Sequence, residues 1–243
     1  MRSATVQRRT DGSLARHDVR RRIEEGIHAG KYPPGTRLAQ QRLAAELGVS
    51  QSVVRESLFE LNQLGLVQIT DNLGAQVSDL DAATLLQAYD IREMLEALAA
   101  RECCRQASRA EIEGVDRLAR EIDELGREGR IEDMAALDRE FHHRIVVLSG
   151  NELLAKLTET VRVLSKAIWL QTSRRILSHH HAQVVDAIRQ NRPDEAERLM
   201  REHIRQGRRR VEEHIANGTF VPRWVAQRGR SGRKGTGGKE DAS

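Results

Sequence analysis

Residues 43–58 read Leu-Ala-Ala-Glu-Leu-Gly-Val-Ser-Gln-Ser-Val-Val-Arg-Glu-Ser-Leu, and this stretch decides the fold of the first part of the chain. It predicts a short helix, a tight turn at Gly48, which can adopt a positive φ, and a second helix capped by Ser50. Apolar residues recur at helical spacing on both sides of the turn, at positions 43, 44 and 47 and then at 54, 58 and 61. Two helices joined in this way form a helix-turn-helix, whose second helix can lie in a DNA major groove.

The segments around this motif complete a winged helix. A first helix is indicated by Val19, Ile23 and Ile27, which are spaced by four residues. After the motif, residues 67–70 and 75–78 alternate apolar and polar side chains, and residues 71–74 can form the loop of a hairpin. We therefore expect a disordered start at residues 1–12 and a winged helix-turn-helix DNA-binding domain at residues 13–79.

Candidate DNA contacts lie mostly at the start of the second helix of the motif. There Gln51, Ser52 and Arg55 face away from the apolar stripe, so their side chains can reach base edges or phosphates. Arg42 is a further candidate, although a solvated residue at a helix start explains it equally well. A glycine in the hairpin loop would let the tip of the wing approach DNA closely. The full candidate set is Arg37, Arg42, Gln51, Ser52, Arg55 and Gly74.

Beyond Asp79 the apolar pattern is purely helical. Six helices are expected. The first runs from Asp81 or Thr84 to about Gln106, the second starts at the capping box Ser108–Glu111, and the third runs from about Ile131 to Ser149. The fourth runs from Asn151 to about Arg174, the fifth from Ser178 to before Asn191, and the last from Pro193 to about Asn217. The fold is therefore expected to be mainly α: an N-terminal winged helix-turn-helix with a small two-stranded β-wing, then an antiparallel all-α bundle at residues 80–217. Residues 218–243 carry six basic and two acidic residues and are expected to form a disordered basic tail.

Four polar residues interrupt the apolar stripes of this bundle. Asp138 and His142 lie one turn apart on the third predicted helix, His181 extends the stripe of the fifth, and His203 lies on the stripe of the last. A single inward histidine is often a hydrogen-bonded core residue, but burying an unpaired carboxylate costs several kcal/mol. A divalent cation would satisfy all four groups, with zinc favoured and nickel, cobalt or manganese as alternatives. The choice of His181 depends on helix phase, and His143 falls off the stripe, so we expect it to be solvated.

Composition excludes several other classes of protein. The 243 residues carry a net charge of +4, and aromatic residues make up only 3%, which argues against a platform for stacking single-stranded bases. No apolar run approaches the roughly 20 residues that cross a bilayer, and no signal peptide is visible, so a soluble cytoplasmic protein is the expectation. Cys103 and Cys104 are adjacent in a helical pattern and are expected to be reduced.

Over about residues 15–215 the chain resembles the GntR family of bacterial repressors, in its FadR subfamily. The segments similar to the winged-helix domain are Pro34-Gly-Thr-Arg-Leu38, Leu43-Ala-Ala-Glu-Leu-Gly-Val-Ser50, Val54-Arg-Glu-Ser-Leu58 and Gly65-Leu-Val67. The segments similar to the FCD effector domain are Ile91-Arg-Glu-Met-Leu-Glu96, Asp138-Arg-Glu-Phe-His142, Gly150-Asn151, His181-Ala-Gln-Val-Val-Asp-Ala-Ile188 and Met200-Arg-Glu-His203.

The resemblance implies a homodimer that binds short palindromic operators of double-stranded DNA near genes of carbon or acid catabolism. It also implies a divalent metal held by an Asp and three His, matching Asp138, His142, His181 and His203, with a small organic acid effector beside or on the metal. Gln51 stands where the family often has Arg, so the preferred bases can differ.

Arg92 is a candidate effector contact, with an ordinary ion pair as the alternative reading. We therefore predict a ligand-responsive transcriptional regulator that acts as a repressor and is not an enzyme. One alternative is a metal-dependent hydrolase, since an Asp/His₃ site with open positions could activate water. The other is a non-specific architectural DNA-binding protein driven by the basic tail.

Overall fold

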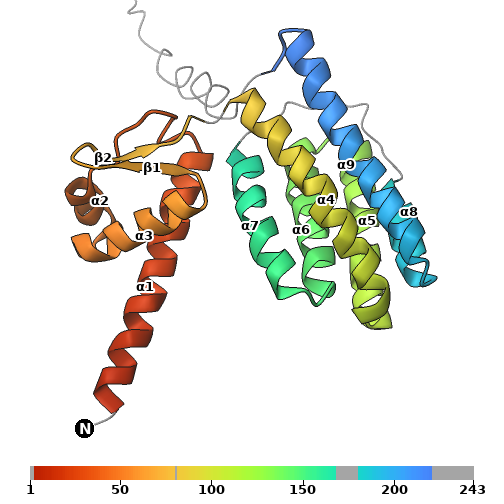
Figure 1. The fold of residues 1–243 in the computed structure, drawn as a ribbon, viewed down its shortest axis with the longest axis horizontal. Helices are drawn as coiled ribbons and strands as arrows, with labels where there is room; N and C mark the ends of the chain where they lie inside the picture. Colours follow the sequence, from red (N-terminus) through yellow and green to blue (C-terminus); the bar gives the residue numbers. More distant parts are fainter. Residues whose placement is uncertain (1–2, 80, 168–179, 221–243) are drawn as a thin grey trace, which may run out of the picture. The chain divides into compact units, whose positions relative to one another are not determined.

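The computed structural model describes residues 3–79, 81–167 and 180–220 (Figure 1). Within these ranges the protein is mainly helical, and it divides into two compact units, the first formed mainly by residues up to Asp81 and the second by residues from Ala82 on. The first unit is a helix-turn-helix with a two-stranded antiparallel wing, and the second is all helical. The predicted fold class is therefore confirmed.

The first unit contains three helices and one hairpin among the described residues. Its elements are α1 (Ser3–His28), α2 (Gln40–Leu47), α3 (Gln51–Gln63), β1 (Val67–Thr70) and β2 (Gly74–Val77). The helix α1 begins at Ser3, so residues 3–12 are helical where the sequence predicted a disordered start. No proline interrupts this segment, and extending an existing helix costs far less than nucleating one. The helix anchored by its buried residues Val19, Ile23 and Ile27 therefore continues toward the N-terminus.

Local signals set the turn and orient α3. Gly48 adopts a left-handed conformation with φ 69° and ends α2, while the Ser50 hydroxyl accepts a hydrogen bond from the backbone N–H of Val53. Val54 and Leu58 on α3 are buried, and α3 packs against α1. This packing fixes the opposite face of α3 toward solvent. In the wing, Val67 pairs with Val77 and Thr70 with Gly74, and the segment around Arg37 adds a bridge to Gln76.

The second unit has helices α4 (Ala82–Gln106), α5 (Arg109–Glu128), α6 (Ile131–Leu148), α7 (Glu152–Ala167), α8 (His180–Arg189) and α9 (Pro193–Ala216). The capping box predicted at Ser108 is present, with the Ser108 and Glu111 side chains each bonding the other's backbone N–H. Pro193 occupies the first turn of α9, and Gly150 follows the end of α6 with φ 68°. The predicted ends at Arg174 and Ser178 lie outside the described residues.

The core of this unit lies between α4, α5, α6, α8 and α9, and α9 runs alongside α4 over much of its length (Figure 1). Phe141, Ile145 and Met200 are fully buried in it. Because α6 packs against α4 and α5, Phe141 and the adjacent His142 are buried inside the unit. No helix within the described part of the chain is long and apolar enough to span a membrane.

Candidate functional site

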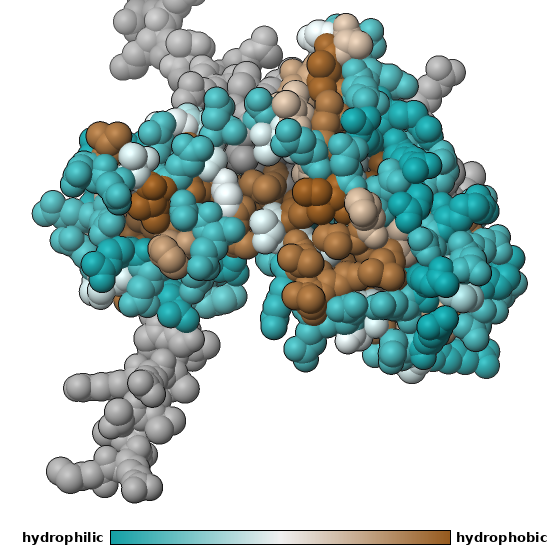
Figure 2. Space-filling model, viewed as in Figure 1, coloured by the Kyte–Doolittle hydropathy of each residue, from teal (hydrophilic) through white to brown (hydrophobic). Residues whose placement is uncertain are grey.

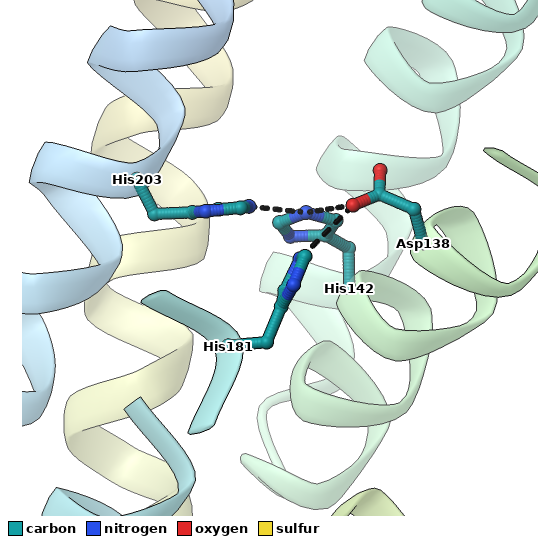
Figure 3. Close-up of side chains that lie close together, drawn as sticks. All are labelled: Asp138, His142, His181 and His203. Atoms are coloured by element: carbon teal, nitrogen blue, oxygen red, sulfur yellow. Dashed lines mark hydrogen bonds and ion pairs between the residues drawn. The ribbon is translucent and has the colours of Figure 1, made fainter. Parts of the chain in front are cut away.

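Four side chains from three helices point toward one another inside the second unit (Figure 3). Asp138 and His142 come from α6, His181 from the first turn of α8, and His203 from α9. The structure therefore brings together the four residues that the sequence singled out. One nitrogen or oxygen atom from each of them lies within 4.8 Å of those of the other three.

The distances between these atoms fit a single cation. Nε2 of His181 lies 3.0 Å from Oδ1 of Asp138, Nε2 of His142 lies 3.8 Å from the same oxygen, and Nε2 of His203 lies 3.1 Å from Nε2 of His142. A metal bound at about 2.0–2.2 Å to each ligand in tetrahedral geometry separates neighbouring ligand atoms by about 3.3–3.6 Å. Three imidazole nitrogens and one carboxylate oxygen are also a donor set that zinc and neighbouring transition metals accept. The residues present therefore fit a divalent cation.

The site has a buried floor and a more open side. His142 and His181 are buried, and their rings make edge contacts with Phe141, at centroid distances of 5.5 Å and 4.7 Å. His203 is partly exposed, and the Asp138 side chain keeps 35% of its accessible surface. A ligand would therefore approach from the side of Asp138 and His203 rather than through the core.

Charge in the site favours ligand-competent protonation states. Burial alone would raise the pKa of Asp138, but His142, His181 and His203 outweigh it and hold that pKa below its ordinary value. Burial, followed by the other two imidazoles, lowers the pKa of His203 well below its ordinary value. An ionised carboxylate and a neutral imidazole are the forms that bind a metal ion.

Glu96 is a site residue that sequence reasoning missed. Its Oε2 lies 2.6 Å from Nδ1 of His142, and its Oε1 accepts a hydrogen bond of 2.6 Å from Nε of Arg92. Burial would raise the pKa of Glu96, but Arg92 and then His142 lower it to about 2. The signal was available, because Glu96 lies among the buried residues of α4, next to Ala97. A carboxylate at the second ring nitrogen of a metal-binding histidine orients that ring.

Arg92 forms an ion pair, which was the alternative to the predicted effector contact. Its side chain is 15% exposed, it is bound to Glu96 on the next turn, and its guanidinium lies 5.2 Å from the centre of the Tyr89 ring. The guanidinium is thus already engaged by a carboxylate of its own helix.

In the first unit the predicted DNA contacts are all at the surface. Gln51, Ser52 and Arg55 are exposed on the first turns of α3, and the Ser52 hydroxyl lies 2.9 Å from that of Ser50. Arg37 reaches the wing, where a Cβ on Gly74 would lie 3.9 Å from its Nη2 atom, and Gly74 has φ 84°. Arg42 is exposed on α2. The structure thus groups Gln51, Ser52 and Arg55 on α3, and Arg37 with Gly74 on the wing.

Comparison with known proteins gives two family matches. Residues 15–77 match the family described as bacterial regulatory proteins, gntR family, and residues 87–206 match the FCD domain. The chain is 36% identical over 178 residues to the Nta operon transcriptional regulator of Aminobacter aminovorans, covering 71% of this chain and 83% of that protein. It is 30% identical over 207 residues to the probable D-xylose utilization operon transcriptional repressor of Paenarthrobacter nicotinovorans, covering 83% and 90%.

Solved structures with the same fold include E. coli McbR/YncC, with a TM-score of 0.68 and 18% identity, covering 83% of this chain and 98% of that one. A GntR regulator from Rhodococcus sp. RHA1 matches with a TM-score of 0.63 and 19% identity, covering 82% and 97%. At these identities the likeness establishes the fold alone.

Proposed function

Because the chain belongs to the GntR family and carries an FCD domain, it is a DNA-binding transcriptional regulator and not an enzyme, and we propose that a small carboxylate bound at a metal in its helical unit controls its affinity for operator DNA. We assign DNA binding to residues 13–79, and effector binding and dimerisation to residues 80–217. Repression is the expected sense of regulation, in keeping with the repressor name of the D-xylose relative. Beyond Phe220 the basic tail lies outside the described residues, and the proposal does not depend on it.

The convergence of Asp138, His142, His181 and His203 carries this proposal. Their ligand atoms meet at spacings that a cation satisfies, inside a bundle where an unpaired carboxylate is costly. Zinc is the expected ion, with nickel, cobalt and manganese as alternatives. A divalent cation held there supplies a Lewis-acid centre that a carboxylate oxygen can bind. The protein's own part is to fix the ligand orientations through Phe141 and Glu96 and to leave the Asp138 side accessible.

Elemental analysis of the purified protein tests the metal site. We expect one transition-metal ion per chain, and a large loss of that metal in His142→Ala. His143→Ala is the matched control, because His143 is the next residue of α6 but is exposed. Equal metal content in the two variants would overturn the assignment of the ligands.

Arg55 is the central residue of the proposed DNA contact. It lies one turn into α3 on the exposed face, where a residue of a recognition helix meets bases or phosphates. We propose contacts from Gln51, Ser52 and Arg55 on α3 and from Arg42 on α2, with Arg37 and Gly74 bringing the wing against the duplex.

The DNA test begins by selecting bound sequences from a random double-stranded library with the metal-loaded protein. A palindromic consensus is expected, because a two-fold dimer presents two identical recognition helices to the DNA. Arg55→Ala should lose about 10- to 100-fold in affinity for that site at fixed salt, since a base contact is worth about 1–3 kcal/mol. Arg22→Ala, an exposed arginine on α1, is the control. An architectural DNA binder would enrich no sequence at all.

The homodimer is supported by an exposed apolar face in the helical unit. The large apolar residues exposed on α4 and α7 are Ile91, Met94, Leu98, Leu153 and Leu157. Figure 2 shows hydrophobic side chains gathered over these two helices. Apolar surface of this extent on one face is typical of a protein interface. We expect Met94→Asp to shift the protein from dimer to monomer in analytical ultracentrifugation, while Met94→Leu stays dimeric; a dimer in both variants would place the interface elsewhere.

A further inference from the structure

Arg210 differs from four other arginines of α9 in the charges around it, and it differs from the exposed Arg198 in being partly buried. Arg201, Arg205, Arg208 and Arg209 each lie within ion-pairing distance of a carboxylate. Arg210 is partly buried, yet among the residues that the structure describes no carboxylate lies within ion-pairing distance of it. A guanidinium that is partly removed from water is stabilised when an anion lies against it.

The position of Arg210 links it to the metal cluster. His203, Gly207 and Arg210 follow one another at spacings of four and three residues, which places them on one face of α9. Side chains of a helix lean toward its N-terminus, and Tyr89 and Asp138 are close enough to Arg210 to affect its pKa, which puts its charge on the side of the metal cluster. Burial lowers the pKa of Arg210, whereas Tyr89, Asp138 and Glu213 act in the opposite direction.

The Tyr89 side chain, from α4, lies against the same face of α9. A Cβ on Gly207 would lie 2.8 Å from Cε1 and 3.3 Å from Oη of the Tyr89 ring, so the phenol rests directly on the glycine backbone. The missing side chain at position 207 therefore leaves the Tyr89 hydroxyl between the His203 and Arg210 turns. A phenol can donate a hydrogen bond to an acidic oxygen. Arg92 covers the ring but is engaged by Glu96, whereas Arg210 has no such carboxylate bound to it in the described part of the chain.

The balance of charge indicates what kind of ligand fits. When a divalent cation is bound, Asp138 neutralises one of its charges and Glu96 neutralises Arg92. Arg210 adds a second positive charge to the one that remains on the metal, and Glu213, three residues further along α9, offsets part of it. Such a site is complementary to a dianion with its two acidic groups separated along α9.

We propose that Arg210 and Tyr89 form an anion subsite beside the Asp138–histidine cluster, so that the effector is a dicarboxylate with one acidic group at the metal and the other on Arg210. This inference rests on the proposed function, because it assumes that a carboxylate effector binds at the metal. To the proposed function, this inference adds the chemical class of the effector and the residue that selects it. Arg210 is a specificity residue in this account, since a monocarboxylate would leave it unpaired.

Calorimetric titration of the zinc-loaded full-length protein tests this. The probes are malonate, succinate, glutarate and adipate, each against the monocarboxylate with the same number of carbons. At least one dicarboxylate should bind about 10- to 100-fold more tightly than its monocarboxylate, the value of one charge-assisted hydrogen-bonded contact. Arg210→Gln should remove that advantage without changing zinc content or monocarboxylate binding. Arg210→Lys should keep part of it, because the charge stays while the forked geometry is lost.

Arg198→Gln is the matched control, since Arg198 is an exposed arginine of the same helix. If Arg210→Gln leaves the dicarboxylate advantage intact, or if the wild type binds mono- and dicarboxylates equally, the anion subsite is wrong while the metal-bound carboxylate stands. If no carboxylate binds the zinc-loaded protein, the proposed function fails and the subsite fails with it. If malonate binds more tightly than its monocarboxylate only because both of its carboxylates chelate the metal, that advantage will persist in Arg210→Gln. This result would count against the subsite.

Discussion

Replacing Glu96 by Gln tests how the metal site is held together. The Glu96 carboxylate makes two contacts in the structure: Oε2 lies 2.6 Å from Nδ1 of His142, and Oε1 accepts a hydrogen bond from Arg92. The amide of Gln can keep the shape but loses the negative charge. Arg92, with 15% of its side chain exposed, is then left without its counter-charge.

Two separate losses follow from these contacts. Breaking a buried ion pair by removing one partner costs about 3–5 kcal/mol. The Arg92 guanidinium keeps its contact with the Tyr89 ring and some exposure, so we expect a loss near the lower end, about 3 kcal/mol. Losing the partner that orients a metal-binding histidine costs about 10- to 100-fold in metal affinity.

Chelator competition at fixed pH measures the affinity, and urea unfolding of the metal-free protein measures the stability. Glu93→Gln is the control, because Glu93 also lies on α4 and pairs with Arg201 and Arg205, but no contact joins it to a metal-cluster residue in the described chain. Both variants should be less stable, and only Glu96→Gln should bind zinc more weakly. If the two variants bind zinc equally well, the idea that Glu96 orients His142 is refuted.

Three further predictions concern the fold. Ser108→Ala should cost about 1 kcal/mol in urea unfolding, because its hydroxyl caps α5; an unchanged midpoint would show that the cap adds nothing. Gly26→Ala should destabilise the winged helix by about 1–3 kcal/mol despite the better helix propensity of Ala. The reason is that its Cβ would lie 2.5 Å from the Tyr32 ring, and a smaller residue at position 32 should restore stability. Burial raises the pKa of the Cys103 thiol to about 12, so at pH 8 it should resist alkylation until the protein unfolds, while the half-buried Cys104 reacts earlier.

The sequence predicted much of this fold because its signals are local. Helical spacing located each described helix, and residues such as Ser108, Gly150 and Pro193 marked the ends. The metal-site residues were found by the same rule, because Asp138 and His142 share a helix face and an inward carboxylate is costly. The start of α1 was misjudged, since a polar composition does not prevent a helix from extending beyond its packed part.

Contacts between helices could not be read in the same way. Periodicity shows that Glu96 is buried on α4, but only the packing of α4 against α6 brings it to His142. The sequence pattern does not show which helices pack against each other, or at what register. Arg92 illustrates the difference, because its ion pair with Glu96 is a contact within one helix at a spacing of four and was within reach of sequence reasoning.

The register of α4 against α9 accounts for the difference between Arg210 and its neighbours. Successive positions on α4 meet successive arginines of α9: Glu93 meets Arg201 and Arg205, and Asp90 meets Arg208. Along α4 the residue that precedes Asp90 is Tyr89, which lies against Gly207. The ion pairs that align the two helices thus place a phenol, and not a third carboxylate, near Arg210. Because these carboxylates are engaged by Arg201, Arg205 and Arg208, the same ion pairs that stabilise the bundle leave the proposed anion subsite available for a ligand.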